Sequence, residues 1–97
     1  MYYRIFKDIM PEFPKGIFNV SIGIENLGKE KLKNIVLIDT IPLGYKLQKF
    51  YKEIPYVQVG KELQIEITEL KVGESIIINY TCIGEGDYPK IEPHVKI

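Results

Sequence analysis

Three segments of this chain alternate apolar and polar residues with a period of two. The apolar phase consists of Phe18, Val20, Ile22 and Ile24, then Leu63, Ile65 and Ile67, then Ile76, Ile78, Tyr80 and Cys82. Successive side chains of a β-strand point to opposite faces, so this period is typical of strands that are buried on one face only. Each segment therefore predicts a strand that packs one face against a core.

The rest of the chain also favours strands. Alanine, the best helix former, is absent, and isoleucine, a good strand former, is abundant. Further strands are expected over residues 2–10, 34–40, at the start of 45–59, and over 91–97, with stiff turn residues such as Pro11 and Pro14 between them. The sequence predicts an all-β fold, an immunoglobulin-like β-sandwich of about seven strands in two antiparallel sheets. Residues 1–97 are expected to form a single domain.

Two connections are harder to assign. Residues 45–59 predict a short strand followed by an irregular crossing to the other sheet, and a short helix over Gln48–Glu53 is an alternative. Gly84–Asp87 is expected to be a hairpin loop between two neighbouring strands, because it is rich in glycine and acidic residues.

Polar turn residues frame the strand at 34–40. Asn26 and Gly28 are expected at positions that need a positive φ, and Gly73 is expected to let the chain reverse before Ser75. Asp39 directly precedes the Pro42–Gly44 turn, where a carboxylate can accept backbone N–H groups. We expect its loss to lower stability by about 1–3 kcal/mol.

The order of these residues resembles a known family. The motifs are Asn26-x-Gly28, Asn34–Asp39, Pro42-x-Gly44 and Leu70-x-x-Gly73-Glu74-Ser75 with Tyr80. From about Ile17 to Tyr80 they are similar to a conserved-repeat domain of bacterial and archaeal surface proteins, a domain of unknown function, and to related adhesion-type sandwich domains.

The resemblance implies a non-catalytic structural or adhesion-type module that spaces or presents domains in a cell-surface or envelope protein. The implied partners are neighbouring domains or other proteins. Only one copy is present, without a sorting or anchoring segment, so we expect one module of a longer extracellular chain. A cytoplasmic location is expected if the chain is the complete protein.

The sequence contains no recognisable set of catalytic residues. Cys82 and His94 form the only thiol–imidazole combination, and Cys82 shares the phase of buried residues. We predict no enzymatic activity, no catalytic residues and no cofactor.

Metal, nucleic-acid and membrane binding are not expected either. Calcium is the best metal hypothesis, through Asp39, Glu74, Glu85 and Asp87, but the chain lacks a calcium-binding loop motif, so no metal site is predicted. The net charge of zero argues against nucleic-acid binding. The absence of an apolar run of about 18 residues argues against membrane insertion.

Phe50, Tyr51 and Tyr56 form the candidate interaction patch. With Lys49 and Lys52 they could present aromatic surface to a protein or a glycan, or they could cover the open end of a small core. The alternative function is therefore a carbohydrate- or protein-binding accessory module attached to an enzyme. Asn19 and Asn79 lie in glycosylation sequons, but both are expected in mid-strand, where modification is uncommon.

Overall fold

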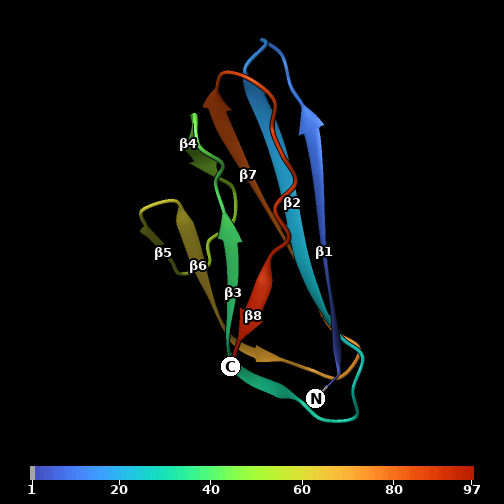
Figure 1. The fold of residues 1–97 in the computed structure, drawn as a ribbon. Helices are drawn as coiled ribbons and strands as arrows, with labels where there is room; N and C mark the ends of the chain where they lie inside the picture. The colour runs from blue at the N-terminus through green and yellow to red at the C-terminus, as the bar shows by residue number, and fades with distance from the viewer. Residues whose placement is uncertain (1) are drawn as a thin grey trace.

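The computed structural model describes residues 2–97, and Figure 1 shows them as two sheets facing each other. The strands are β1 (Tyr3–Pro11), β2 (Ile17–Asn26), β3 (Leu32–Thr40), β4 (Tyr45–Phe50), β5 (Tyr56–Val59), β6 (Glu62–Leu70), β7 (Ser75–Gly84) and β8 (His94–Lys96). One sheet, the β2–β7 sheet, has the order β1-β2-β7-β4, and the other, the β3–β6 sheet, has the order β5-β6-β3-β8. The all-β sandwich is thus confirmed, with eight strands in place of about seven.

The core lies between the two sheets and uses the predicted apolar phases. In the β2–β7 sheet Val20 lies opposite Tyr80 and Ile22 opposite Ile78. The fully enclosed side chains are Val20, Ile22, Ile24, Leu37, Leu63, Ile65, Leu70, Ile78, Tyr80 and Cys82. Burial of each large apolar side chain stabilises the fold by roughly 1.5–3 kcal/mol, which makes this layer the main source of stability.

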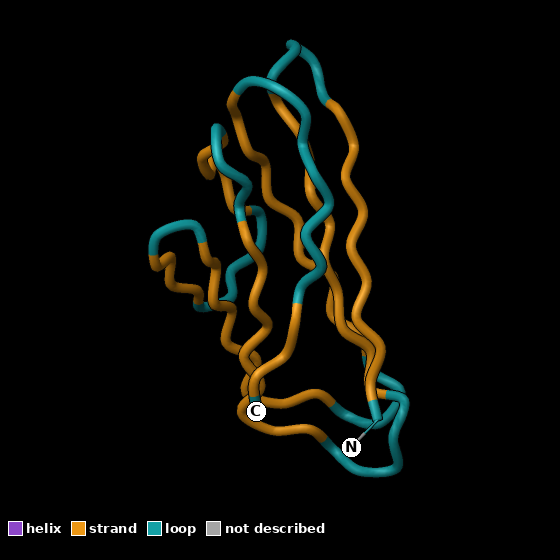
Figure 2. The backbone as a smooth tube through the Cα atoms, viewed as in Figure 1, coloured by secondary structure: helices purple, strands orange, loops and turns teal. Residues whose placement is uncertain are grey.

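Two predicted connections are wrong. Gly84–Asp87 is not a hairpin loop, because β7 is already paired with β2 and β4 and so has no free edge for β8, which pairs with β3 instead. Gln48–Glu53 forms no helix. Its first residues belong to β4, which pairs with β7 through a bulge between Leu47 and Lys49, and the chain then crosses to β5 (Figure 2).

The turns confirm part of the expected chemistry. Gly44 and Gly73 have positive φ values of 87° and 79°, which a side chain would disfavour. The expectation for Asn26 and Gly28 is wrong, since neither residue has a positive φ. Asn26 is buried and works through its side chain instead. Its carboxamide donates to the carbonyls of Glu30 and Leu70 and accepts the N–H of Gly28, so it holds the corner together.

The two ends of the described chain lie at one pole of the sandwich. Tyr2 and Ile97 line the same groove, of about 660 Å³ (Figure 1). At the opposite pole Gly84 donates its N–H to the Gly16 carbonyl and Glu85 donates to the Gly44 carbonyl, which joins three loops. Residues 2–97 contain no helix that is long and apolar enough to cross a membrane.

Candidate functional site

The outward-facing side of the β2–β7 sheet carries two cross-strand pairs of polar residues. Asn19 lies opposite Thr81, and Ser21 lies opposite Asn79. Ser21 donates a hydrogen bond to the Asn79 side-chain oxygen, and Thr81 donates one of 3.0 Å to the Gln48 side-chain oxygen. These bonds use the two carboxamide oxygens and leave the two NH₂ groups as donors. We call Asn19, Ser21, Gln48, Asn79 and Thr81 the outer polar face.

Tyr51 lies at one edge of the outer polar face. Its backbone N–H donates to the Asn79 carbonyl at 3.0 Å, which continues the pairing of β4 with β7 by one residue. Tyr51 shares the phase of Lys49, whose Nζ lies 4.8 Å from the ring centre. Tyr51 is 54% exposed. An accessible aromatic ring therefore stands beside a row of hydroxyl and amide groups.

Phe6 lies across the sheet from Tyr51, on β1. Its ring fills the space over Gly23, where an added Cβ would lie 2.1 Å from the ring. The Arg4 guanidinium lies 5.3 Å from the ring centre. Strands β7 and β2 separate the strand of Phe6 from that of Tyr51, which corresponds to about 14 Å at ~4.8 Å per strand. Tyr51 extends the row of Asn79 and Ser21, whereas Phe6 lies in the neighbouring row with Gly23. Ser21 and Asn79 therefore lie between the two aromatic rings, and Asn19 and Thr81 form the next row on the side away from Phe6.

The structure places the predicted patch residues on different sides of the sheet. Phe50 pairs with Tyr80 in the inward phase, and its ring stacks on Tyr56 at a centroid distance of 4.1 Å and lies nearly parallel to Tyr80 at 6.5 Å. Phe50 and Tyr56 thus join β4 of one sheet to β5 of the other and cover the side of the core. Tyr51 belongs to the opposite phase. A role for the three residues in binding stays a prediction.

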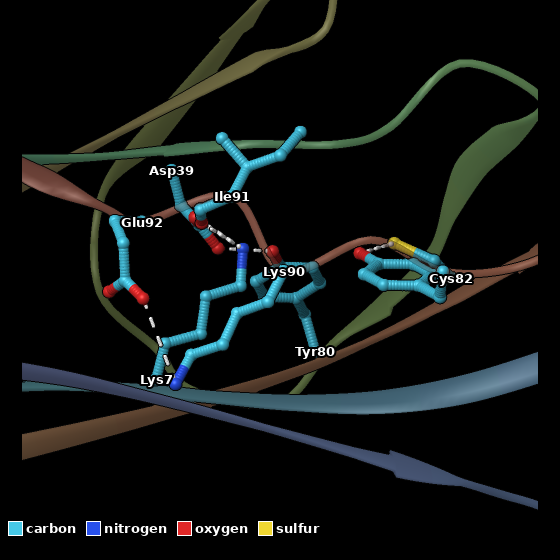
Figure 3. A network of polar contacts seen from close by, with 8 residues as sticks. Lys7, Asp39, Tyr80, Cys82, Lys90, Ile91 and Glu92 are labelled. Atoms are coloured by element: carbon cyan, nitrogen blue, oxygen red, sulfur yellow. Dashed lines mark hydrogen bonds and ion pairs between the residues drawn. The ribbon is translucent and has the colours of Figure 1, made fainter.

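A second polar cluster lies inside the sandwich (Figure 3). Lys7 Nζ is 2.7 Å from Asp39 Oδ1 and 2.8 Å from the Ile91 carbonyl oxygen, and the Tyr80 hydroxyl donates to Asp39 Oδ2. The Lys7 and Asp39 side chains are completely enclosed. The expected role of Asp39 in the turn is therefore wrong, because both of its oxygens are bonded to side chains of other strands.

Burial controls the titration of the neighbouring groups. Burial, and then the negative charge of Asp39, raise the pKa of Tyr80, which keeps its hydroxyl protonated as a donor. Burial also raises the pKa of the Cys82 thiol, which the Tyr88 hydroxyl contacts at 3.5 Å. The expectation of a buried Cys82 is confirmed. His94 is exposed on β8, in the other sheet from Cys82.

The groups considered for calcium and for glycosylation are placed as follows. Within residues 2–97 there is no group of three or more His, Cys, Asp or Glu residues able to hold a metal ion. Asp39 is bonded to Lys7, and the Glu74 carboxylate accepts the Lys71 N–H. Asn19 and Asn79 are half-buried in mid-strand, as expected, and their modification stays a prediction.

Comparison with known proteins gives structural similarity only. No protein-family model and no curated protein matches the sequence, so the resemblance to the conserved-repeat domain stays a prediction. The fold is similar to the chitin-binding domain of Chi18aC from Streptomyces coelicolor, with a TM-score of 0.72 and 14% identity over 96% of this chain and 89% of that one.

Two larger proteins contain a similar sandwich. Chitinase ChiA74 from Bacillus thuringiensis matches with a TM-score of 0.64 and 20% identity over 95% of this chain. The GH20 exo-β-N-acetylglucosaminidase from Vibrio harveyi matches with a TM-score of 0.62 and 14% identity over 97% of this chain. The matched parts are 15% and 17% of those two proteins. At these identities the likeness shows the fold alone, a β-sandwich.

Proposed function

We propose that this chain is a non-catalytic module that binds a polysaccharide of the chitin type, as an accessory to a glycoside hydrolase. The observation that carries the proposal is the likeness to a chitin-binding domain over nearly the whole of both chains. The similar sandwiches within a chitinase and an N-acetylglucosaminidase support the same substrate class. Fold alone does not define function, so the proposal also needs a suitable surface.

The outer polar face supplies that surface. A sugar ring presents C–H groups on its faces, which pack on aromatic rings, and hydroxyl and acetamide groups at its edges, which need hydrogen-bond partners. The exposed Tyr51 ring offers the first kind of contact, and the NH₂ groups of Gln48 and Asn79 offer the second. The strands of Tyr51 and Phe6 are about 14 Å apart, which is long enough for several contacts with one polymer chain.

Binding to insoluble chitin tests the proposal. We expect the chain to sediment with chitin, and Tyr51→Ala to bind roughly two- to ten-fold more weakly, because stacking on one aromatic ring contributes about 0.5–1.5 kcal/mol. Tyr2→Ala is the matched control, since Tyr2 is 68% exposed and lies at the pole that carries the two ends. Tyr56→Ala tests the other exposed tyrosine of the predicted patch.

The result can contradict the proposal in two ways. If the folded wild-type chain does not bind chitin above an inert-bead background, the substrate class is wrong. If it binds but Tyr51→Ala binds as well as Tyr2→Ala, the assignment of the surface is wrong, and loss of binding in Tyr56→Ala alone would move the site to the side of the sandwich.

A second candidate function is the structural or adhesion-type module of a surface protein. Strand β5 favours it, because all four of its residues are exposed and it pairs with β6 alone, which leaves one edge open for strand addition by a partner. The Tyr56 and Gln58 amides point to this open edge, because Pro55, Val57 and Val59 are the residues of β5 that bond to β6. Protection of these two amides from hydrogen exchange, on joining the chain to a neighbouring domain, would support it. A cell-surface or extracellular location stays a prediction.

A further inference from the structure

Lys7 and Asp39 connect the two sheets inside the sandwich. Lys7 belongs to β1 of the β2–β7 sheet, and Asp39 belongs to β3 of the opposite sheet. Their side chains are fully enclosed, and Nζ is 2.7 Å from Oδ1. The amine is thus held against the carboxyl group, with the carboxyl carbon as the next atom beyond the contacting oxygen.

We propose that Lys7 and Asp39 condense to form an intramolecular amide cross-link between the sheets. A proton first moves along the hydrogen bond from the Lys7 ammonium to the Asp39 carboxylate, which gives an amine and a carboxylic acid. The Nζ lone pair then forms a bond to the Asp39 carboxyl carbon, and the bond from this carbon to one oxygen breaks. That oxygen leaves as water with the transferred proton and one of the two amine protons, and the other proton stays on the amide nitrogen, so atoms and charge balance without any further reactant.

The neighbouring groups suit this reaction. Attack on the carboxyl carbon places negative charge on its remaining oxygen, and the Tyr80 hydroxyl already donates to Asp39 Oδ2. The Ile91 carbonyl accepts a hydrogen bond from Nζ at 2.8 Å and fixes the direction of the amine. Because both reactants belong to one folded chain, no translational entropy is lost on bringing them together.

Burial favours the product over the ion pair. Two opposite charges inside a protein lose their hydration, and their mutual attraction does not always compensate. The amide is neutral and removes both charges from the core, and the enclosed site keeps out the water needed for the reverse reaction. The chain contains a single cysteine, so an intramolecular disulfide is not available to join the sheets.

The intact mass of the folded chain tests the proposal. After prolonged incubation we expect the wild-type chain to weigh less than its sequence requires by the mass of one water molecule. Proteolysis should then release one branched peptide that contains both Lys7 and Asp39. Lys7→Met should keep the full mass. Asp39→Asn places an amide at the same carbon and should lose ammonia instead of water, which gives the same final product.

Two outcomes would overturn the proposal. One is the full sequence mass in a wild-type chain that is shown to be folded by its circular dichroism and by protease resistance. The other is a loss of water without the branched peptide, which would indicate cyclisation of an aspartate with its own backbone. Chitin binding is measured separately, so failure of the cross-link leaves the proposed function untouched.

Discussion

Lys7 shows why a single residue can be missed in a sequence. It follows the phase of Ile5 and Ile9 on β1, which predicts burial, whereas its charge predicts exposure. Only its partner resolves the conflict, and Asp39 is 32 residues away on a strand of the other sheet. For Asp39 the sequence predicts hydrogen bonds with the neighbouring turn, because only residues close in sequence can be recognised as its partners. A charged residue in an apolar phase is the signal that could have located this cluster.

Removing Lys7 should destabilise the protein strongly. Lys7→Met leaves the Asp39 carboxylate buried without its cation, and relative to wild-type chain that still has the full sequence mass, and so the ion pair, we expect a loss of about 3–5 kcal/mol in the free energy of unfolding. Adding Asp39→Asn to this variant removes the orphaned charge while keeping an acceptor for Tyr80, so most of the loss should be recovered. Urea unfolding of both variants measures the difference. If the single and the double variant are equally stable, the unpaired charge of Asp39 is not the cause of the destabilisation.

Strand phases could be predicted, whereas strand partners could not. The apolar phases of β2, β6 and β7 follow from local alternation and are confirmed by their burial. The error at Gly84–Asp87 arose because a glycine-rich loop indicates a reversal without indicating which edge is still free. Strand β5 escaped prediction because all four of its residues are exposed, so no alternation marks it. Tyr51 was grouped with Phe50 by sequence, although adjacent strand residues face opposite sides.

The pairing of β1 with β2 offers a test at the level of the strand. Gly23 lies opposite Phe6, whose ring would contact an added Cβ. In Gly23→Ala the ring must swing away, and because a surface ring can move freely we expect stability to change by less than about 1 kcal/mol. Chitin binding should nevertheless weaken to the level of Phe6→Ala. Unchanged binding in both variants would exclude Phe6 from the proposed surface.

The whole molecule joins its sheets through polar as well as apolar contacts. The sandwich class and its single core could be predicted from composition and alternation, because those features act through burial alone. The outer polar face could not, since Asn19 and Asn79 were visible only as sequons and their pairing with Thr81 and Ser21 depends on register. Tyr80 faces inward from β7 and reaches Asp39 on β3 of the opposite sheet, and this contact links global stability to pH.

Stability should fall in alkaline solution more steeply for the wild type than for Tyr80→Phe. In the unfolded chain Tyr80 ionises near pH 10, whereas in the folded chain its pKa is raised and the hydroxyl stays protonated. The contribution is therefore complete below about pH 10 and decreases above it, by up to about 1.4 kcal/mol per pH unit. Urea unfolding at about pH 8 and about pH 11 measures both slopes. If the free energy of unfolding falls equally with pH in the wild type and in Tyr80→Phe, the ionisation of Tyr80 does not cause the alkaline loss of stability.

The position of both chain ends at one pole affects how the sandwich could be carried. A domain fused at Tyr2 or at Ile97 would contact the sandwich at the same pole. The long axis of the sandwich would then point away from the attached domain, by up to its length of 43 Å. Several copies of the domain joined end to end would each project from the line of the linkers, and they would not stack into a longer rod. The proposed binding surface lies along the long side of the sandwich. This side could lie flat on a solid substrate while the attached domain does not touch the substrate.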